Sequence, residues 1–234
     1  GQASITAQDV DNGSFDNWQR GIQVYNTPLT YTSDRWKLAG SGGEVSRSSI
    51  PALGCYAMYC STDTAIVQAV EIANYGTGSL AGPFVNGSTW TVSLVSNQTP
   101  DSITVAWVDF AATASGLAAK GNEPIVDLGE VVPGFNRYSL TFQVINAENI
   151  NQNTKGFQIG LVLPSGTTFS QVQLEQSPVA TPFEQRPLSI EKTLSERYYQ
   201  RTTATQNNQR IAISGNGSPA GSVSYTHLRA HETV

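Results

Sequence analysis

Histidine is nearly missing from this chain of 234 residues, and the two present, His227 and His231, lie close to its C-terminal end. Residues 1–221 therefore lack the imidazole base of a Ser-His-Asp or Cys-His nucleophile system, and imidazole metal sites are excluded there. The His-x3-His spacing is compatible with metal ligation on a helix, but the tail around it breaks with the composition of the rest. Neither a metal nor a cofactor is predicted.

Charge is also scarce, since Asp, Glu, Lys and Arg make up 13% of the residues and the formal net charge is -5. The Lys and Arg residues form no run, which excludes a nucleic-acid partner because phosphate binding needs clustered cations. No apolar stretch approaches the ~20 residues that span a bilayer, and Gly1 to Ser4 lack the order of a signal peptide. We expect a soluble chain without membrane insertion, covered by neutral polar groups as in secreted, virion and carbohydrate-binding proteins.

Only two cysteines occur, Cys55 and Cys60. Strand residues five apart point to opposite faces, so a disulfide between them requires a turn or bulge. Two reduced thiols are favoured over a bridge, and two ligands do not make a zinc site.

Period-two alternation is abundant from about residue 30 to residue 175, and it indicates strands rather than helices. In Tyr138 to Ile145, for example, apolar and polar side chains fall on alternate faces. We predict an all-β fold, a two-sheet antiparallel β-sandwich with the jelly roll as the favoured version, because each sheet must bury its apolar face. The predicted strands are 34–39, 56–60, 66–72, 89–95, 103–110, 124–128, 138–145, 157–163 and 169–175.

Outside these strands, Ala111 to Gly121 is small and polar and is predicted to be a long loop. Ile190, Leu194 and Tyr198 fall on one face of a short amphipathic helix. The tail resembles a chimeric terminal peptide and is expected to be non-native. The predicted order is an N-terminal segment at 1–8, the jelly roll at 9–187, the helix at 188–201, a linker or the start of a distal fibre segment at 202–221, and the irregular tail at 222–234.

Carboxylates offer the remaining route to hydrolysis, because a glycosidase needs two of them about 5 to 9 Å apart. Glu71 and Asp109 each interrupt an apolar alternation. A rim position, or pairing with Arg35 or Arg137, is favoured over a dyad, so no catalytic residue is predicted. Asp9 to Ser14 superficially resembles a calcium loop but is read as a turn.

Aromatic residues offer sugar-stacking faces. Tyr25, Tyr31 and Tyr75 lie beside Asn, Thr and Gly in predicted loops and are the candidates for glycan binding. The tryptophans at 36, 90 and 107 lie in alternating strands, where we expect them to be core residues.

Three sets of residues, in this order, resemble a family of bacteriophage tail-fibre and other virion surface proteins. The first set matches Asn-x-x-Phe-x-x-Trp-Gln-Arg-Gly, and the second matches Tyr-Thr-Ala-Asp-Arg-Trp with Ser33 in place of Ala. The third begins at the end of the last predicted strand and continues beyond it, with Glu196 in place of Gln. The resemblance covers about residues 9–201 and rests on Asn12, Phe15, Trp18 to Gly21, Tyr31 to Trp36, Gln173 to Glu175, Ala180 to Glu184, Arg186, Pro187 and Glu196 to Tyr199.

This resemblance implies a jelly roll similar to carbohydrate-binding modules, carried on a tail or head fibre at the virion surface. It implies a homotrimer among other virion proteins that adheres to a bacterial surface glycan, and a module that is not an enzyme. Two alternatives stay open. One is a carbohydrate-active enzyme or its accessory carbohydrate-binding module, and the other is a purely architectural trimeric component.

The motif residues also have a structural interpretation. Arginine forms bidentate pairs with carboxylates, and such pairs would lock the first and last strands together. The residues assigned to this role are Trp18, Arg20, Asp34, Arg35, Trp36, Glu175, Glu184 and Arg186.

Overall fold

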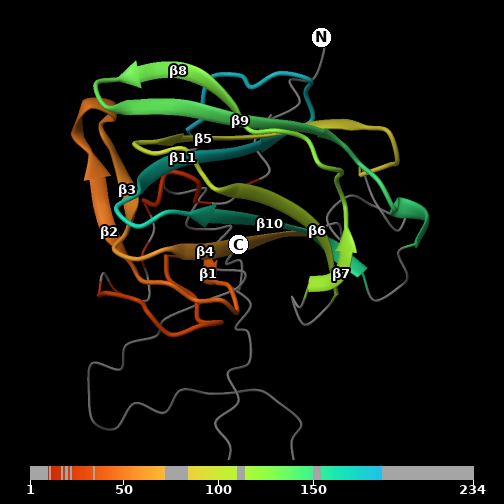
Figure 1. The fold of residues 1–234 in the computed structure, drawn as a ribbon, viewed down its shortest axis with the longest axis horizontal. Coiled ribbons are helices and arrows are strands. Elements are labelled where there is room, and N and C mark those ends of the chain that lie inside the picture. The colour runs from red at the N-terminus through yellow and green to blue at the C-terminus, as the bar shows by residue number, and fades with distance from the viewer. Residues whose placement is uncertain are drawn as a thin grey trace, which may run out of the picture.

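The computed structural model describes residues 10, 12–16, 18, 21, 23–33, 35–71, 84–109, 114–149 and 154–185 (Figure 1). This part of the chain forms strands and two short 3-10 helices, η1 (Pro51–Leu53) and η2 (Ala147–Asn149), and it contains no α-helix. The strands are β1 (Lys37–Leu38), β2 (Val45–Ile50), β3 (Cys55–Cys60), β4 (Thr64–Glu71), β5 (Thr89–Ser96), β6 (Ser102–Asp109), β7 (Ala114–Ala118), β8 (Val126–Val132), β9 (Phe135–Gln143), β10 (Thr154–Leu163) and β11 (Thr168–Glu175).

The strands form two antiparallel sheets that lie face to face (Figure 1). The five-stranded sheet has the order β1-β4-β10-β6-β7, and the six-stranded sheet has the order β2-β3-β11-β5-β9-β8. Consecutive strands repeatedly cross from one sheet to the other, as they do in jelly rolls. The predicted all-β, two-sheet sandwich is confirmed.

Alternation along the strands builds the core between the sheets. Trp90 pairs with Phe142 and Val92 pairs with Leu140 across β5 and β9, and all four side chains are buried. Phe157 of β10 lies opposite them, with its ring centroid 6.3 Å from that of Phe142. One row of apolar residues from each sheet therefore meets in the middle, as the two-residue period predicts.

The predicted elements differ from the structure in three places. The segment 111–121, predicted to be a loop, contains β7, because Ala118 pairs with Ala106 of β6 and small side chains suffice for backbone pairing at an edge. The polar strand β2 was missed, since its sequence carries no apolar alternation. The strand predicted at 124–128 starts later and runs through Glu130 to Val132. The predicted helix at 188–201 and the tail lie outside the described residues.

The two cysteines face opposite sides of β3. Cys60 belongs to the core between the sheets, whereas Cys55 belongs to a small cluster on the outer face of the six-stranded sheet, with Ile50, Ala57 and Val95. Both thiols are free and buried. The preference for two reduced thiols is confirmed, and strand geometry is the reason.

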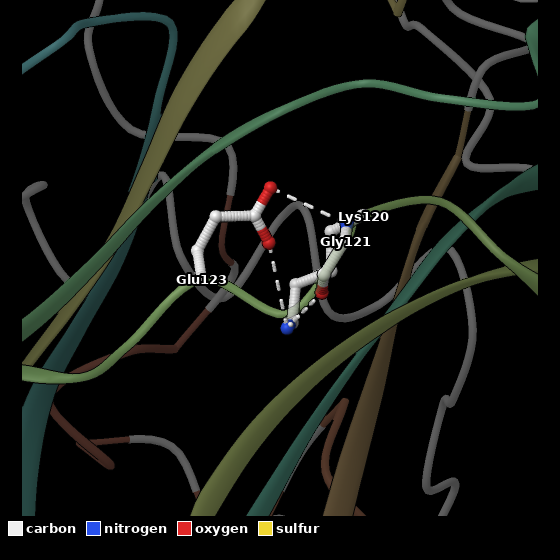
Figure 2. Close-up of polar contacts among 3 residues, drawn as sticks. All are labelled: Lys120, Gly121 and Glu123. Atoms are coloured by element: carbon white, nitrogen blue, oxygen red, sulfur yellow. Dashed lines mark hydrogen bonds and ion pairs between the residues drawn. The ribbon is translucent and has the colours of Figure 1, made fainter.

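The chain crosses from the five-stranded to the six-stranded sheet through residues 119–125, where a short polar turn fixes its path (Figure 2). Lys120 Nζ donates to the carbonyl of Gly121 at 2.8 Å and lies 3.7 Å from Glu123 Oε2. The Gly121 N–H donates to Glu123 Oε1 at 3.3 Å. These contacts are local to the turn that precedes β8.

Candidate functional site

Trp18 of the first motif and the glycan-binding candidate Tyr25 pack against each other. Tyr25 is 9% exposed and Trp18 is 8% exposed, and their ring centroids lie 6.2 Å apart. The Tyr25 hydroxyl donates to the carbonyl of Gly21 at 2.7 Å. Tyr25, a candidate for glycan stacking, therefore has its ring engaged within the protein. Tyr75 lies outside the described residues.

Exposed tyrosines lie on one side of the sandwich, which we call the β1–β2 side. Tyr31 is 38% exposed and forms a backbone bridge with Lys37 of β1. Tyr56 of β3 is 39% exposed, and β3 pairs with the edge strand β2. Tyr59 of β3 is 37% exposed, but strand alternation places it on the opposite face of β3, so it is not part of this group. Because residues 23–33 bridge both Val45 of β2 and β1, the edges of the two sheets lie together here. Sequence reasoning found Tyr31 but missed Tyr56, which lies in a strand.

The first motif is anchored in the core. The Phe15 ring lies 5.6 Å from that of Trp36 and meets Phe169 edge-on at 5.2 Å and 82°. Trp36 Nε1 donates to the carbonyl of Asn12 at 3.2 Å. Since Phe169 is on the last strand, these contacts join the start of the sandwich to its end.

The last motif closes on a buried carboxylate. Glu175 is 1% exposed, and the Thr181 N–H and hydroxyl donate to its two oxygens, each at 2.6 Å. Gln173 Nε2 donates to Glu175 Oε2 at 3.1 Å, while Gln173 Oε1 accepts the N–H of Glu184 at 2.9 Å. The loop of residues 176–185 is thereby held on the outer face of β11.

Arg137 of β9 completes this arrangement. Its guanidinium donates to the Ser93 hydroxyl at 3.0 Å and to the carbonyl of Thr181. Burial lowers the pKa of Arg137, and the negative charge of Glu175 opposes that shift. We call Glu175, Gln173, Thr181 and Arg137 the carboxylate clasp. Sequence reasoning placed Gln173, Glu175 and Thr181 in the last motif but did not link Arg137 to Glu175, because Arg137 lies in a different strand and no local signal links the two.

The remaining motif residues lie outside the carboxylate clasp or contribute only their backbone to it. Arg35 is buried, has a positive φ of 73° and donates to the carbonyl of Ala69 at 2.7 Å, so it ties its turn to β4. Glu184 is exposed and contributes its backbone N–H to the clasp. Arg20, Asp34 and Arg186 lie outside the described residues, so their ion pairs stay predictions.

The two strand acids end β4 and β6, the two strands that flank β10. Glu71 pairs with Gly156 and Asp109 pairs with Thr154, so they lie on either side of β10 at one end of the five-stranded sheet. Val70 and Trp107 both belong to the core. The expectation that Glu71 and Asp109 form no catalytic pair stays a prediction.

Two further kinds of site are absent from the residues that the structure describes. No cluster of three or more His, Cys, Asp or Glu side chains there has the geometry to hold a metal ion. A helix with the length and apolar character to cross a membrane is likewise not found in that part.

Comparison with known proteins gives little. No protein-family model matches the chain, and no curated protein matches it. Among solved structures, the chain is similar to the enzymatically active domain of tailspike protein 4 of bacteriophage CBA120, with 14% sequence identity and a TM-score of 0.39. The match covers 73% of this chain and 22% of the tailspike chain, so this chain spans about a fifth of the length of the tailspike chain.

One prediction is corrected here. The sequence resemblance implied a module that is not an enzyme, whereas the matched tailspike domain is described as enzymatically active. The match is too distant to assign a reaction or catalytic residues to this chain. The prediction that this module is not an enzyme is nevertheless not kept.

Proposed function

We propose that this chain is a carbohydrate-binding β-sandwich module of a bacteriophage surface protein, either a module that accompanies a carbohydrate-active domain or part of a fibre that adheres to a host glycan. The observation that carries the proposal is the exposure of Tyr31 and Tyr56 on the β1–β2 side. Aromatic rings half in solvent offer flat apolar faces for sugar rings, and neighbouring hydroxyl and amide groups offer hydrogen bonds.

Two other features support it. The ordered motifs that resemble phage fibre proteins run from Asn12 to Tyr199, and the residues that the structure describes among them build the junction between the first and last strands. The surface of the chain is also rich in neutral polar residues, with 13% charged residues overall. Such a surface suits the recognition of neutral hydroxyl groups. Assembly as a homotrimer with other virion proteins is part of the proposal.

A glycan array probed with the full chain tests the binding function. Tyr31→Ala is expected to remove most of the signal, because the side chain offers an exposed ring without filling the core. Leu128→Ala is the matched control, since Leu128 is 50% exposed on β8, the edge strand on the other side of the six-stranded sheet. An equal loss in both variants would show that the β1–β2 side is not the binding face.

Two further measurements separate the alternatives. Release of reducing sugar from glycans that the array identifies would add a catalytic role. Light scattering of the full chain tests the trimer, and a trimer that binds no glycan at all would leave only an architectural role.

A further inference from the structure

Arg47 and Tyr56 form a stacked pair on the β1–β2 side. The guanidinium carbon of Arg47, on edge strand β2, lies 3.8 Å from the ring centroid of Tyr56 on β3. The two are diagonal neighbours, since Arg47 pairs with Met58 and Tyr56 pairs with Ser49. A cation over an exposed ring face gains about 0.5–1 kcal/mol from the ring quadrupole. The stack therefore holds the head of Arg47 in place.

The pair lies on an open ledge. Val45 and Met58 are buried in the core between the sheets, and strand alternation places Arg47, Ser49 and Tyr56 on the same side of β2 and β3. Tyr56 is nevertheless 39% exposed, and Ser49 is exposed too. The five-stranded sheet therefore does not cover this end. Arg47, Ser49 and Tyr56 form what we call the ledge.

The ledge carries an uncompensated positive charge. In the described part of the chain, no carboxylate pairs with Arg47, and the hydroxyls of Ser49 and Tyr56 have no hydrogen-bond partner. Glu44, just before β2, falls on the opposite side by alternation and accepts a hydrogen bond from Ser61 at 2.5 Å. Among the described residues, the guanidinium stacked on Tyr56 is thus presented without a carboxylate partner, beside two hydroxyls without hydrogen-bond partners.

A carboxylate on a sugar ring fits these groups. Guanidinium binds carboxylate through two parallel hydrogen bonds that are stronger than neutral ones, while serine and tyrosine hydroxyls both donate and accept. A nucleic-acid backbone would need several clustered cations, and this chain has a net charge of -5.

We propose that the ledge is a subsite for an acidic sugar, a uronic or sialic acid unit of a surface glycan. The sugar carboxylate binds Arg47, and the neighbouring ring hydroxyls of the sugar bind Ser49 and Tyr56. This inference rests on the proposed carbohydrate-binding function and names the class of sugar that it takes.

NMR titration of the full chain tests it, with glucuronate and N-acetylneuraminate as acidic probes and glucose and N-acetylglucosamine as neutral ones. Arg47→Gln keeps most of the side-chain stem and removes the charge, so affinity for the acidic sugars is expected to fall about tenfold while neutral binding is unchanged. Arg47→Lys keeps the charge but loses the bidentate geometry, and its affinity is expected to be intermediate. Added salt is expected to weaken the unmodified chain more than Arg47→Gln.

Two controls isolate the ledge. Tyr59 is 37% exposed on the same strand but on the opposite side, so Tyr59→Ala is expected to leave binding of the acidic sugars unchanged, whereas Tyr56→Ala weakens it. Lys37→Gln removes a cation from β1 and is expected to have no effect. Thermal unfolding confirms that each variant is folded.

The outcomes separate this inference from the function on which it rests. Equal affinity for acidic and neutral sugars, or acidic binding that survives Arg47→Gln, overturns the ledge subsite and leaves glycan binding in place. Absence of binding to every sugar and to the glycan array overturns the proposed function, and the subsite with it.

Discussion

Glu175 and Thr181 close the sandwich: the backbone N–H and the hydroxyl of Thr181 donate to the two carboxylate oxygens of Glu175, each at 2.6 Å. The carboxylate is 1% exposed, and a buried charge is tolerated only when it is hydrogen-bonded and paired. Thr181 and Gln173 supply the hydrogen bonds, and Arg137 supplies the opposite charge. These hydrogen bonds are the physical reason why the segment from Gln173 to Glu184 folds back on itself.

Removal of this carboxylate is expected to be costly. Glu175→Ala leaves the donors of Thr181 and Gln173 buried without an acceptor, so the free energy of unfolding is expected to fall by about 2–4 kcal/mol. Denaturant unfolding followed by tryptophan fluorescence measures it. Asp101→Ala, at an exposed position, is the control and is expected to change stability by less than about 0.5 kcal/mol. Equal stability of the two variants would contradict the clasp.

Gly13 is expected to tolerate no side chain. A Cβ there would lie 2.1 Å from the carbonyl oxygen of Val172, whose own N–H donates to the Gly13 carbonyl at 3.0 Å. Since a backbone atom cannot move aside cheaply, Gly13→Ala is expected to cost about 1–3 kcal/mol. At Gly40 the nearest atom would be a Leu29 methyl carbon at 3.9 Å, so a Gly40→Ala variant as unstable as Gly13→Ala would refute the steric argument.

Phe15 is expected to anchor the first motif. Its fully buried ring contacts Trp36 and Phe169, so Phe15→Ala is expected to lower the free energy of unfolding by about 3–5 kcal/mol. Val179 is 63% exposed, and Val179→Ala serves as the comparison in the same denaturation experiment. A small effect at Phe15 would mean that the segment before residue 18 is not part of the core.

The buried thiols predict a loss of stability at high pH. Burial raises the pKa of Cys60 from 9.0 to about 12, and burial also raises the pKa of Cys55. The unfolded chain therefore loses the Cys60 proton first, and the free energy of unfolding is expected to decline as pH rises from 9 toward 12, with the full contribution present below pH 9.

Cys60→Ala, compared with the unmodified chain over the same pH range, should show a shallower decline. In the native chain both thiols are expected to resist alkylation at mildly alkaline pH and to react once the chain is unfolded, because the thiolate is the reactive form. Rapid alkylation of Cys60 in the folded chain would contradict its burial.

Much of the fold follows from local pattern. Trp90, Val92 and Leu94 alternate with polar residues, and so do Tyr138, Leu140 and Phe142, and both rows are buried as the pattern predicts. The polar strand β2 escaped prediction because Val45–Ile50 has no such alternation, and its place is fixed by pairing with β3. The ledge was not predicted either, because the sequence pattern around Tyr56 does not distinguish an exposed tyrosine from a buried one.

The sequence by itself determined that the chain makes two sheets with an aromatic core, because the two-residue period is a property of neighbouring residues and needs no partner. Only the tertiary structure decided which polar groups meet. Arg137 and Ser93 are 44 positions apart, as are Arg137 and Thr181, and they come together only when β5, β9 and β11 are in register. Contacts over such separations depend on strand order, which alternation does not encode.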